Sequence, residues 1–299
     1  MKIFMTGATG YIGGTIARRL LDDGHEIRGL VRDAEKGGKL AVFGVEPVIG
    51  GLDDAAILAA EARRADAVIN TANSDHRGAI DAFLEALAGS NKPFLHTSGS
   101  SIVADDAHGD VASEKIYDEE TPFEPVPGKQ ARVAIDRMIR DASSRGVRSI
   151  VVCPTMIYGN GLGLARDSAQ IPGLAKRAKA SGVVRHVGKG LNVWSNVHVE
   201  DVADIYRLAL PRAPAGAFYF AENGEASYRD ICAAIARRLK LGAPQAWPFA
   251  EAAKELGENS AAYTFGSNSR VRGKRTRSEL GWQPKYASAT AWIEAELPL

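Results

Sequence analysis

Lys2-Ile3-Phe4-Met5-Thr6-Gly7-Ala8-Thr9-Gly10-Tyr11-Ile12-Gly13-Gly14 joins a short apolar strand to a turn whose glycines stand three residues apart. Apolar side chains at helical spacing follow over residues 12–21, so the pattern predicts a helix directly after the turn. A diphosphate at a helix N-terminus needs backbone N–H groups close to it, and side chains would hold the backbone away. The stretch therefore predicts a seat for a pyrophosphate, where Gly7 and Gly10 open the approach and Gly13 lets the helix press against the strand.

Glycines at this spacing also occur in ordinary strand-to-helix turns that hold no ligand. The position of this turn between a strand and a helix at the start of the chain favours the nucleotide interpretation.

Composition restricts the class of protein. The 299 residues can form one large α/β domain, alone or with a smaller appendage. The 37 Lys and Arg residues nearly balance 36 Asp and Glu residues, which argues against nucleic acid or a membrane surface as the main partner. We see no leader segment and no apolar stretch near the ~20 residues that span a bilayer. The two cysteines form no CxxC motif and the histidines show no ligand spacing, so we expect a cytoplasmic protein with reduced thiols and no metal site.

Strands and helices alternate along the first half of the chain. We expect strands at residues 26–31, 46–49, 67–72, 94–98 and 149–153, and a long helix from about 127 to 145. Several of these strands are apolar on both faces, which predicts an α/β protein with a Rossmann doubly wound parallel sheet. The alternation loosens after residue 160, where helices at 172–181 and 227–239 mix with short strands near 193–194 and 218–220. We therefore predict a nucleotide-binding domain at 1–160 and a smaller C-terminal substrate-binding subdomain at 161–299, interleaved with the last strands of the sheet.

The end of the second strand bears on the choice of dinucleotide. A ribose 2′-hydroxyl is usually received by an acidic side chain there, whereas a 2′-phosphate needs a cation. The strand ends in Val31, Arg32 follows it, and a guanidinium can fork onto phosphate oxygens. This favours NADP(H), while Asp33 leaves NAD open if the strand is one residue longer. Thr71 and Ala72 after the fourth strand, and Thr97 at the end of the fifth, are expected to line the same cleft.

Four segments carry a family resemblance: TGATGYIG at 6–13, PTMIYG at 154–159, NVHVEDVA at 196–203 and LGWQP at 280–284. Together they resemble, across nearly the whole chain, the extended and atypical branches of the short-chain dehydrogenase/reductase superfamily, which include the NAD-dependent epimerases and dehydratases. The resemblance implies a nicotinamide cofactor and pairing of two copies through the helices that flank the sheet. It implies cofactor contacts from Gly7, Thr9, Gly10, Tyr11, Ile12, Gly13, Arg32, Thr71, Ala72, Thr97 and Pro154.

The acid–base residues of that family are only partly present. Its Tyr-x-x-x-Lys pair would fall at Pro125 and Lys129, or at Gly128 and Arg132, so the tyrosine is missing in either alignment. Gly99 stands where the family has its catalytic hydroxyl. The candidate substitutes are Ser98, Ser100, Lys129 and Tyr117, and each has a structural alternative: a turn for the serines, a solvated helix start for the lysine and a core edge for the tyrosine.

Two further patterns have plain structural interpretations. His198 is expected to precede a helix that Asp201 caps. The basic stretch at 270–277 is expected to be a charge-balanced surface rather than an anion site. We therefore expect an NADP(H)-dependent oxidoreductase acting on a small carbonyl/alcohol substrate. A non-catalytic NAD(P)-binding redox sensor stays open, as does a sugar-nucleotide epimerase or dehydratase, although the missing tyrosine disfavours the latter.

Overall fold

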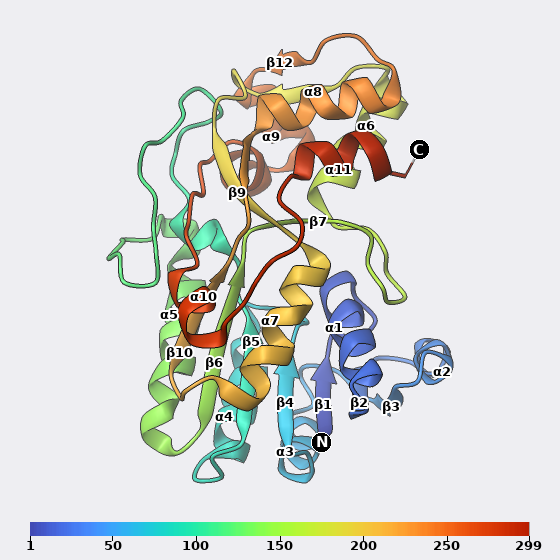
Figure 1. Cartoon of the computed structure of the whole chain (residues 1–299), viewed down its shortest axis with the longest axis vertical. Helices are drawn as coiled ribbons and strands as arrows, with labels where there is room; N and C mark the ends of the chain where they lie inside the picture. Colours follow the sequence, from blue (N-terminus) through green and yellow to red (C-terminus); the bar gives the residue numbers. More distant parts are fainter. Residues whose placement is uncertain (299) are drawn as a thin grey trace.

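The computed structural model describes residues 1–298 and contains a central sheet of seven parallel strands (Figure 1). The strands lie in the order β10-β6-β5-β4-β1-β2-β3. The order reverses direction between β1 and β4, and the crevice at such a switch point is the usual ligand site of an open α/β sheet. The strands are β1 (Lys2–Thr6), β2 (Glu26–Val31), β3 (Glu46–Ile49), β4 (Ala67–Asn70), β5 (Pro93–Thr97), β6 (Arg148–Pro154) and β10 (Ala217–Ala221).

Helices cover both faces of this sheet, and the alternation of β1 shows why. Ile3 and Met5 face one buried cluster, to which α1 and α7 contribute, while Phe4 faces a second cluster built with α3, α4 and α5. A strand buried on both faces must be apolar at every position, which is the pattern that predicted a doubly wound α/β fold. The structure confirms that fold class. The helices are α1 (Tyr11–Asp22), α2 (Ala34–Val42), α3 (Ala55–Arg64), α4 (Arg77–Leu87), α5 (Gln130–Asp141) and α7 (Val199–Arg212).

The C-terminal part forms a smaller layer above the carboxyl ends of the central strands (Figure 1). Its third apolar cluster joins β7, α6, α8 and α11. It contains a three-stranded sheet of β7 (Met156–Tyr158), β9 (Val193–His198) and β11 (Glu225–Ser227), and a pair of β8 (Arg185–Val187) and β12 (Gln245–Trp247). Its helices are α6 (Gln170–Ser181), α8 (Tyr228–Leu239), α9 (Phe249–Leu256), α10 (Lys274–Leu280) and α11 (Ala289–Glu296).

The two parts are interleaved along the chain. After β9 the chain returns to the first layer, where α7 packs beside α1 and β10 pairs with β6. The predicted boundary at residue 160 therefore does not separate the chain into two independent sequences of elements, and a division into domains 1–160 and 161–299 stays a prediction.

The helix predicted at 127–145 is divided into three parts. Short 3-10 turns, η2 (Pro127–Lys129) and η3 (Ala142–Arg145), flank α5, and Gly146 ends the run in a left-handed conformation with φ of +72°. Pro127 favours the first turn because its ring fixes φ and it has no N–H to leave unsatisfied. Two further short turns matter below: the 3-10 turn η1 (Ser100–Val103) after β5 and the π-helical turn η4 (Ser260–Phe265).

No helix among residues 1–298 is both long and apolar enough to cross a bilayer. The same residues contain no group of three His, Cys, Asp or Glu side chains placed to hold a metal ion.

Candidate cofactor-binding site

The glycine turn packs so closely that side chains are excluded from it. Gly7 has a φ of +77°, and the N–H of Gly10 donates to its carbonyl at 2.9 Å. A Cβ on Gly7 would lie 2.6 Å from Thr71 Oγ1, and a Cβ on Gly13 would lie 2.3 Å from the Gly7 carbonyl oxygen. Because such contacts are too short for any real side chain, these glycines allow α1 to press onto the ends of β1 and β4.

The N-terminus of α1 keeps its first N–H groups available. Gly10 is the N-cap residue and offers no side chain to them. A cavity of about 470 Å³ opens beside this turn at the switch point of the sheet. It is lined by Thr6, Gly7, Thr9, Leu30, Val31, Arg32, Lys36, Gly50, Gly51, Leu52, Asp53, Ala72, Asn73 and His76. A glycine cradle, unpaired amides and an adjoining cavity together fit the diphosphate and adenosine end of a dinucleotide.

The far end of this cavity is cationic. Arg32 and Lys36 line it, and the exposed Arg32 has no ion-pair partner among the described residues. Asp33 does not line the cavity: its carboxylate caps α2 by accepting the Lys36 N–H at 2.8 Å, and it pairs with the Lys36 ammonium at 3.0 Å. These bonds, the backbone one foremost, lower the pKa of Asp33. Asp33, the acidic residue that kept NAD possible in the sequence, is therefore bound to the first turn of α2.

Two cavity residues have no signal in the sequence pattern. His76 caps α4 through Nδ1, which accepts from the Ala79 N–H at 3.1 Å, and its Nε2 lies 3.1 Å from Asp53 Oδ1. His76 comes from the loop after β4 and Asp53 from the loop after β3. The two residues meet in one cavity because these strands are parallel and end at the same edge of the sheet.

The other predicted cofactor residues are placed in different ways. Thr71 donates its hydroxyl to the Thr6 carbonyl at 2.8 Å, and Ala72 lines the cavity. Tyr11 donates to the Gly159 carbonyl at 2.9 Å and is largely buried. Ile12 packs against the cluster shared by α1 and α7. These last two residues can therefore offer a ligand their backbone rather than their side chains.

Thr97 and Pro154 end their strands beneath the cleft. The Thr97 hydroxyl lies 2.6 Å from the hydroxyl of the buried Tyr206 in α7, and Pro154 is paired with Ala221 of β10. Their cofactor role stays a prediction.

The serines after β5 have buried partners. Ser98 donates to Asp136 Oδ2 at 2.6 Å, and Ser100 shares a 2.8 Å hydrogen bond with the hydroxyl of Ser269. Asp136 lies in α5, where burial raises its pKa to about 7, and its other oxygen has no partner among residues 1–298. Both hydroxyls thus link distant segments: that of Ser98 donates to Asp136, and that of Ser100 accepts from Ser269.

The start of α5 carries two cations. Arg132 forms a two-pronged ion pair with Asp75, with Nε to Oδ1 at 2.8 Å and Nη2 to Oδ2 at 2.5 Å. Its Nη1 lies 3.5 Å from the point where a Cβ on Gly99 would stand. Lys129 is half-buried, and burial, followed by the charge of Arg132, lowers its pKa.

Tyr117 lies in the loop before α5 and packs against the apolar cluster there. Its N–H donates to the Arg270 carbonyl at 2.9 Å, and its ring meets Phe123 edge-on at 5.9 Å between centroids. It covers the edge of the cluster below α5.

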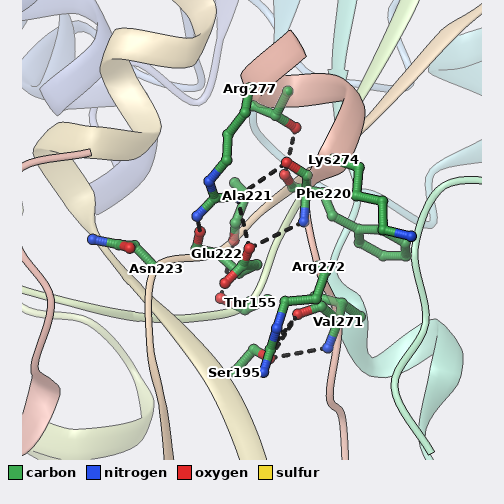
Figure 2. Close-up of polar contacts among 12 residues, drawn as sticks. Thr155, Ser195, Phe220, Ala221, Glu222, Asn223, Val271, Arg272, Lys274 and Arg277 are labelled. Carbon is green, nitrogen blue, oxygen red and sulfur yellow. Dashed lines mark hydrogen bonds and ion pairs between the residues drawn. The ribbon is translucent and has the colours of Figure 1, made fainter. Parts of the chain in front are cut away.

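The basic stretch 270–277 is paired with acids, as Figure 2 shows around Glu222. Arg277 donates to the buried carboxylate of Glu222 at 2.7 Å, and the Gly273 N–H donates to the same oxygen at 3.1 Å. The remaining cations pair with Glu225, Asp118 and Glu120. The charge-balanced surface expected from the sequence is therefore what the structure has.

The three later motif segments contact one another rather than the cavity, which the first segment lines. A Cβ on Gly159 would lie 2.2 Å from His198 Nε2, and Trp282 donates its indole N–H to the Asp201 carbonyl at 2.9 Å. His198 itself caps α7, since its Nδ1 accepts the Glu200 N–H at 3.3 Å. The expectation that Asp201 is the cap is wrong, because its carboxylate instead accepts the N–H groups of residues 285 and 286.

The sequence matches the model of the NAD dependent epimerase/dehydratase family over residues 3–219. It is 31% identical over 325 residues to the oxidase ucsJ of Acremonium sp, covering 95% of this chain and 92% of the relative. It is 27% identical over 237 residues to the 4-hydroxy-2-methyl-3-oxo-4-farnesyl-3,4-dihydroquinoline-1-oxide ketoreductase of Stigmatella aurantiaca, covering 75% of this chain and 69% of the relative.

Solved structures share the fold at lower identity. The crystal structure of DesIV, a dTDP-glucose 4,6-dehydratase from Streptomyces venezuelae with NAD and TYD bound, superposes with a TM-score of 0.80. It is 18% identical and covers 99% of this chain and 96% of that one. At this identity the likeness concerns the fold alone.

Proposed function

This chain belongs to the NAD dependent epimerase/dehydratase family, and from that membership we propose that it is an NADP(H)-dependent oxidoreductase that interconverts a small carbonyl compound and its alcohol. The membership confirms the resemblance drawn from the four sequence motifs. Relatives that carry the names oxidase and ketoreductase support redox chemistry. Because fold alone does not fix the reaction, the proposal also depends on the residues of the cavity.

The cationic end of the cavity is the observation that supports NADP(H). Arg32 and Lys36 line it, whereas Asp33 is held by α2. A free carboxylate at this place would accept a ribose hydroxyl and repel a phosphate, so its engagement elsewhere favours the phosphorylated coenzyme. A forked guanidinium matches the oxygens of a 2′-phosphate.

The remaining residues of the site would have different roles toward the cofactor and the substrate. The amides after Gly7 and Gly10 would hold the diphosphate, and Thr9 and Ala72 would flank it. When bound, the nicotinamide supplies or accepts the hydride. Arg132 beside Gly99 offers a fixed positive charge near the end of β5. Ser98 donates its proton to Asp136 and Ser100 is bonded to Ser269, and these buried bonds favour a proton donor from another segment.

Two measurements test this proposal. Titration calorimetry with NADPH and NADH should give the smaller dissociation constant for NADPH. Absorbance at the nicotinamide band should then fall when the NADPH-loaded protein receives a member of a panel of aldehydes and ketones. No heat with either coenzyme would overturn the cofactor assignment.

A second candidate is favoured by the missing Tyr-x-x-x-Lys tyrosine: a non-catalytic sensor of the NADP(H) redox state. A sensor would bind the oxidised and reduced coenzymes with different affinities and would turn over no member of the same panel. A sugar-nucleotide epimerase or dehydratase is disfavoured because those reactions depend on that tyrosine.

We propose in addition that the protein is cytoplasmic and pairs with a second copy through helices that flank the sheet. Light scattering coupled to size-exclusion chromatography measures the mass in solution and so tests the pairing.

A further inference from the structure

A tyrosine from the far end of the chain lies against the start of α5. A Cβ built on Gly128 would stand 3.1 Å from Cε2 and 3.6 Å from Cδ2 of Tyr263, which belongs to the π-helical turn η4. Gly128 is the position that lacks a tyrosine when Arg132 takes the place of the family lysine. The ring of Tyr263 therefore occupies the space that a side chain of residue 128 would enter.

One cation of this helix start lies over the ring, and a second stands one turn further along the helix. The Lys129 ammonium lies 5.7 Å from the centre of the Tyr263 ring, a distance typical of a cation–π contact. Arg132 stands one turn further along, with its guanidinium beside Gly99, where the family has its catalytic hydroxyl. The alignment with Arg132 in the lysine position thus agrees with the geometry, since it brings residues 99, 128 and 132 to one place.

The hydroxyl of Tyr263 is free for a ligand. It makes no hydrogen bond to any group within residues 1–298, and its residue is only partly buried. Tyrosines 11, 206, 219, 228 and 286 each bond through their hydroxyl, and Tyr158 is buried. Tyr117 packs edge-on against Phe123 and is not among the nearest neighbours of a Cβ built on Gly128.

The turn that carries Tyr263 is fixed in place. Ala261 and Ala262 are buried beside it, and the Ser267 hydroxyl donates to the Tyr263 carbonyl at 3.0 Å. Turns of π-helix are rare in proteins, and those that occur often lie at functional sites.

We propose that the Tyr263 hydroxyl is the proton donor to the carbonyl oxygen of the substrate, with Lys129 as the positioning residue; this inference rests on the function proposed above. As hydride reaches the carbonyl carbon, the C=O π pair moves to oxygen. That oxygen takes the proton of the Tyr263 O–H, and water returns a proton to the phenolate. The ammonium of Lys129 stabilises the negative charge that Tyr263 carries in between.

Chemical modification tests the position of Tyr263 without turnover. N-acetylimidazole acetylates accessible phenols, and peptide mass spectrometry reports the rate at each tyrosine. We expect saturating NADP⁺ to slow acetylation of Tyr263 at least about tenfold and to leave that of the exposed Tyr286 unchanged. Equal rates at Tyr263 with and without NADP⁺, or no reaction there in the free protein, would overturn the proposal.

Matched substitutions test the role in catalysis. Tyr263→Phe keeps the ring, so it should preserve the fold and the dissociation constant for NADPH while kcat falls by about 10²–10⁴-fold, the usual contribution of a general acid. Tyr286→Phe, at the tyrosine that serves as the acetylation control, should leave kcat unchanged. Lys129→Met should lower kcat and Lys129→Arg should restore part of it. A Tyr263→Phe protein with the wild-type kcat contradicts the assignment.

The acetylation and substitution experiments distinguish a failure of this inference from a failure of the proposed function. If the wild-type protein turns over no carbonyl compound, the proposed function fails, while the acetylation experiment still decides whether Tyr263 lies at the cofactor. If turnover occurs and Tyr263→Phe does not reduce it, only the inference fails.

Discussion

Arg32 is the side chain that tests the proposed preference for NADPH most directly. It lines the cavity without an ion-pair partner among residues 1–298, while its neighbour Asp33 is held by Lys36. A hydrogen bond to a charged group contributes about 1.5–3 kcal/mol. Arg32→Ala should therefore raise the dissociation constant for NADPH by roughly 10–100-fold, as measured by calorimetry, and barely change that for NADH.

Lys39→Ala is the matched control for this substitution. Lys39 also lies in α2, but it pairs with Glu35 at 2.7 Å and does not line the cavity. It should leave both dissociation constants unchanged. Equal losses for NADPH and NADH in Arg32→Ala would show that the guanidinium does not contact the 2′-phosphate.

A substitution at Gly13 tests how closely the glycine turn is packed. Gly13→Ala places a methyl group 2.3 Å from both the Gly7 carbonyl oxygen and Thr71 Oγ1, so α1 must move. Overpacking of this kind costs about 1–3 kcal/mol of unfolding free energy. We expect that loss in urea denaturation, together with weaker coenzyme binding.

Gly38→Ala is the contrasting substitution for the same assay. Gly38 lies on the exposed side of α2, where a Cβ meets nothing within 4 Å. It should stabilise the protein by about 0.4–1 kcal/mol, because alanine has fewer unfolded conformations. If the two variants were equally stable, the steric explanation of Gly13 would be wrong.

At the scale of elements, Asp136 connects α5 to the end of β5. Burial raises its pKa to about 7 from an ordinary value of 3.8, so the folded protein holds a proton that the unfolded chain releases between those pH values. Stability from this group is complete below about pH 4 and is lost as pH rises to about 7. Asp136→Asn removes this dependence.

The measurement is the unfolding free energy of the Asp136→Asn and wild-type proteins at several pH values. The difference, variant minus wild type, should rise with pH between about 4 and 7 by at most about 1.4 kcal/mol per unit and then level off. Gln130→Ala, at an exposed position of the same helix that carries no ionisable side chain, should give a difference independent of pH. A flat difference for Asp136→Asn would mean that its carboxyl is ionised in the fold.

The elements themselves were largely predictable from the sequence. Strand β1 and its neighbours are short apolar runs bounded by turns, and both signals are local. The cap of α7 was not predictable, because His198 and Asp201 both suit a helix start and only the partners from residues 285 and 286 decide between them. In the same way, the hydrogen bond of the Ser98 hydroxyl was not predictable, because the carboxylate that accepts it belongs to Asp136, 38 positions further along the chain.

At the scale of the whole molecule, the missing tyrosine shows what a sequence pattern cannot predict, namely a contact between distant segments. The pattern around residues 125–132 establishes that no tyrosine is present there, but it says nothing about what fills the space. Tyr263 reaches Gly128 only because the C-terminal layer lies above the carboxyl ends of the central strands (Figure 1). The close-packed glycine turn could be predicted because it is one continuous segment, whereas the proposed chemistry joins β5, α5 and η4.

The contact of Glu222 with Arg277 tests how the C-terminal segment is held to the sheet (Figure 2). Glu222 directly follows β10, and its side chain is 4% exposed. Arg277→Met would leave that buried carboxylate with the Gly273 N–H but without its cation. We expect a loss of about 1.5–3 kcal/mol of unfolding free energy, the range for a hydrogen bond to a charged group.

The control separates buried from exposed ion pairs in the same helix. Arg275 pairs at 3.2 Å with Glu120, whose side chain is 75% exposed, so Arg275→Met should cost no more than about 1 kcal/mol. Adding Glu222→Gln to Arg277→Met should recover part of the loss, because a neutral amide is less costly to bury without a cation. If Arg277→Met and Arg275→Met cost the same, β10 and α10 are held together by apolar packing, and the ion pair at the end of β10 contributes no more than a surface contact.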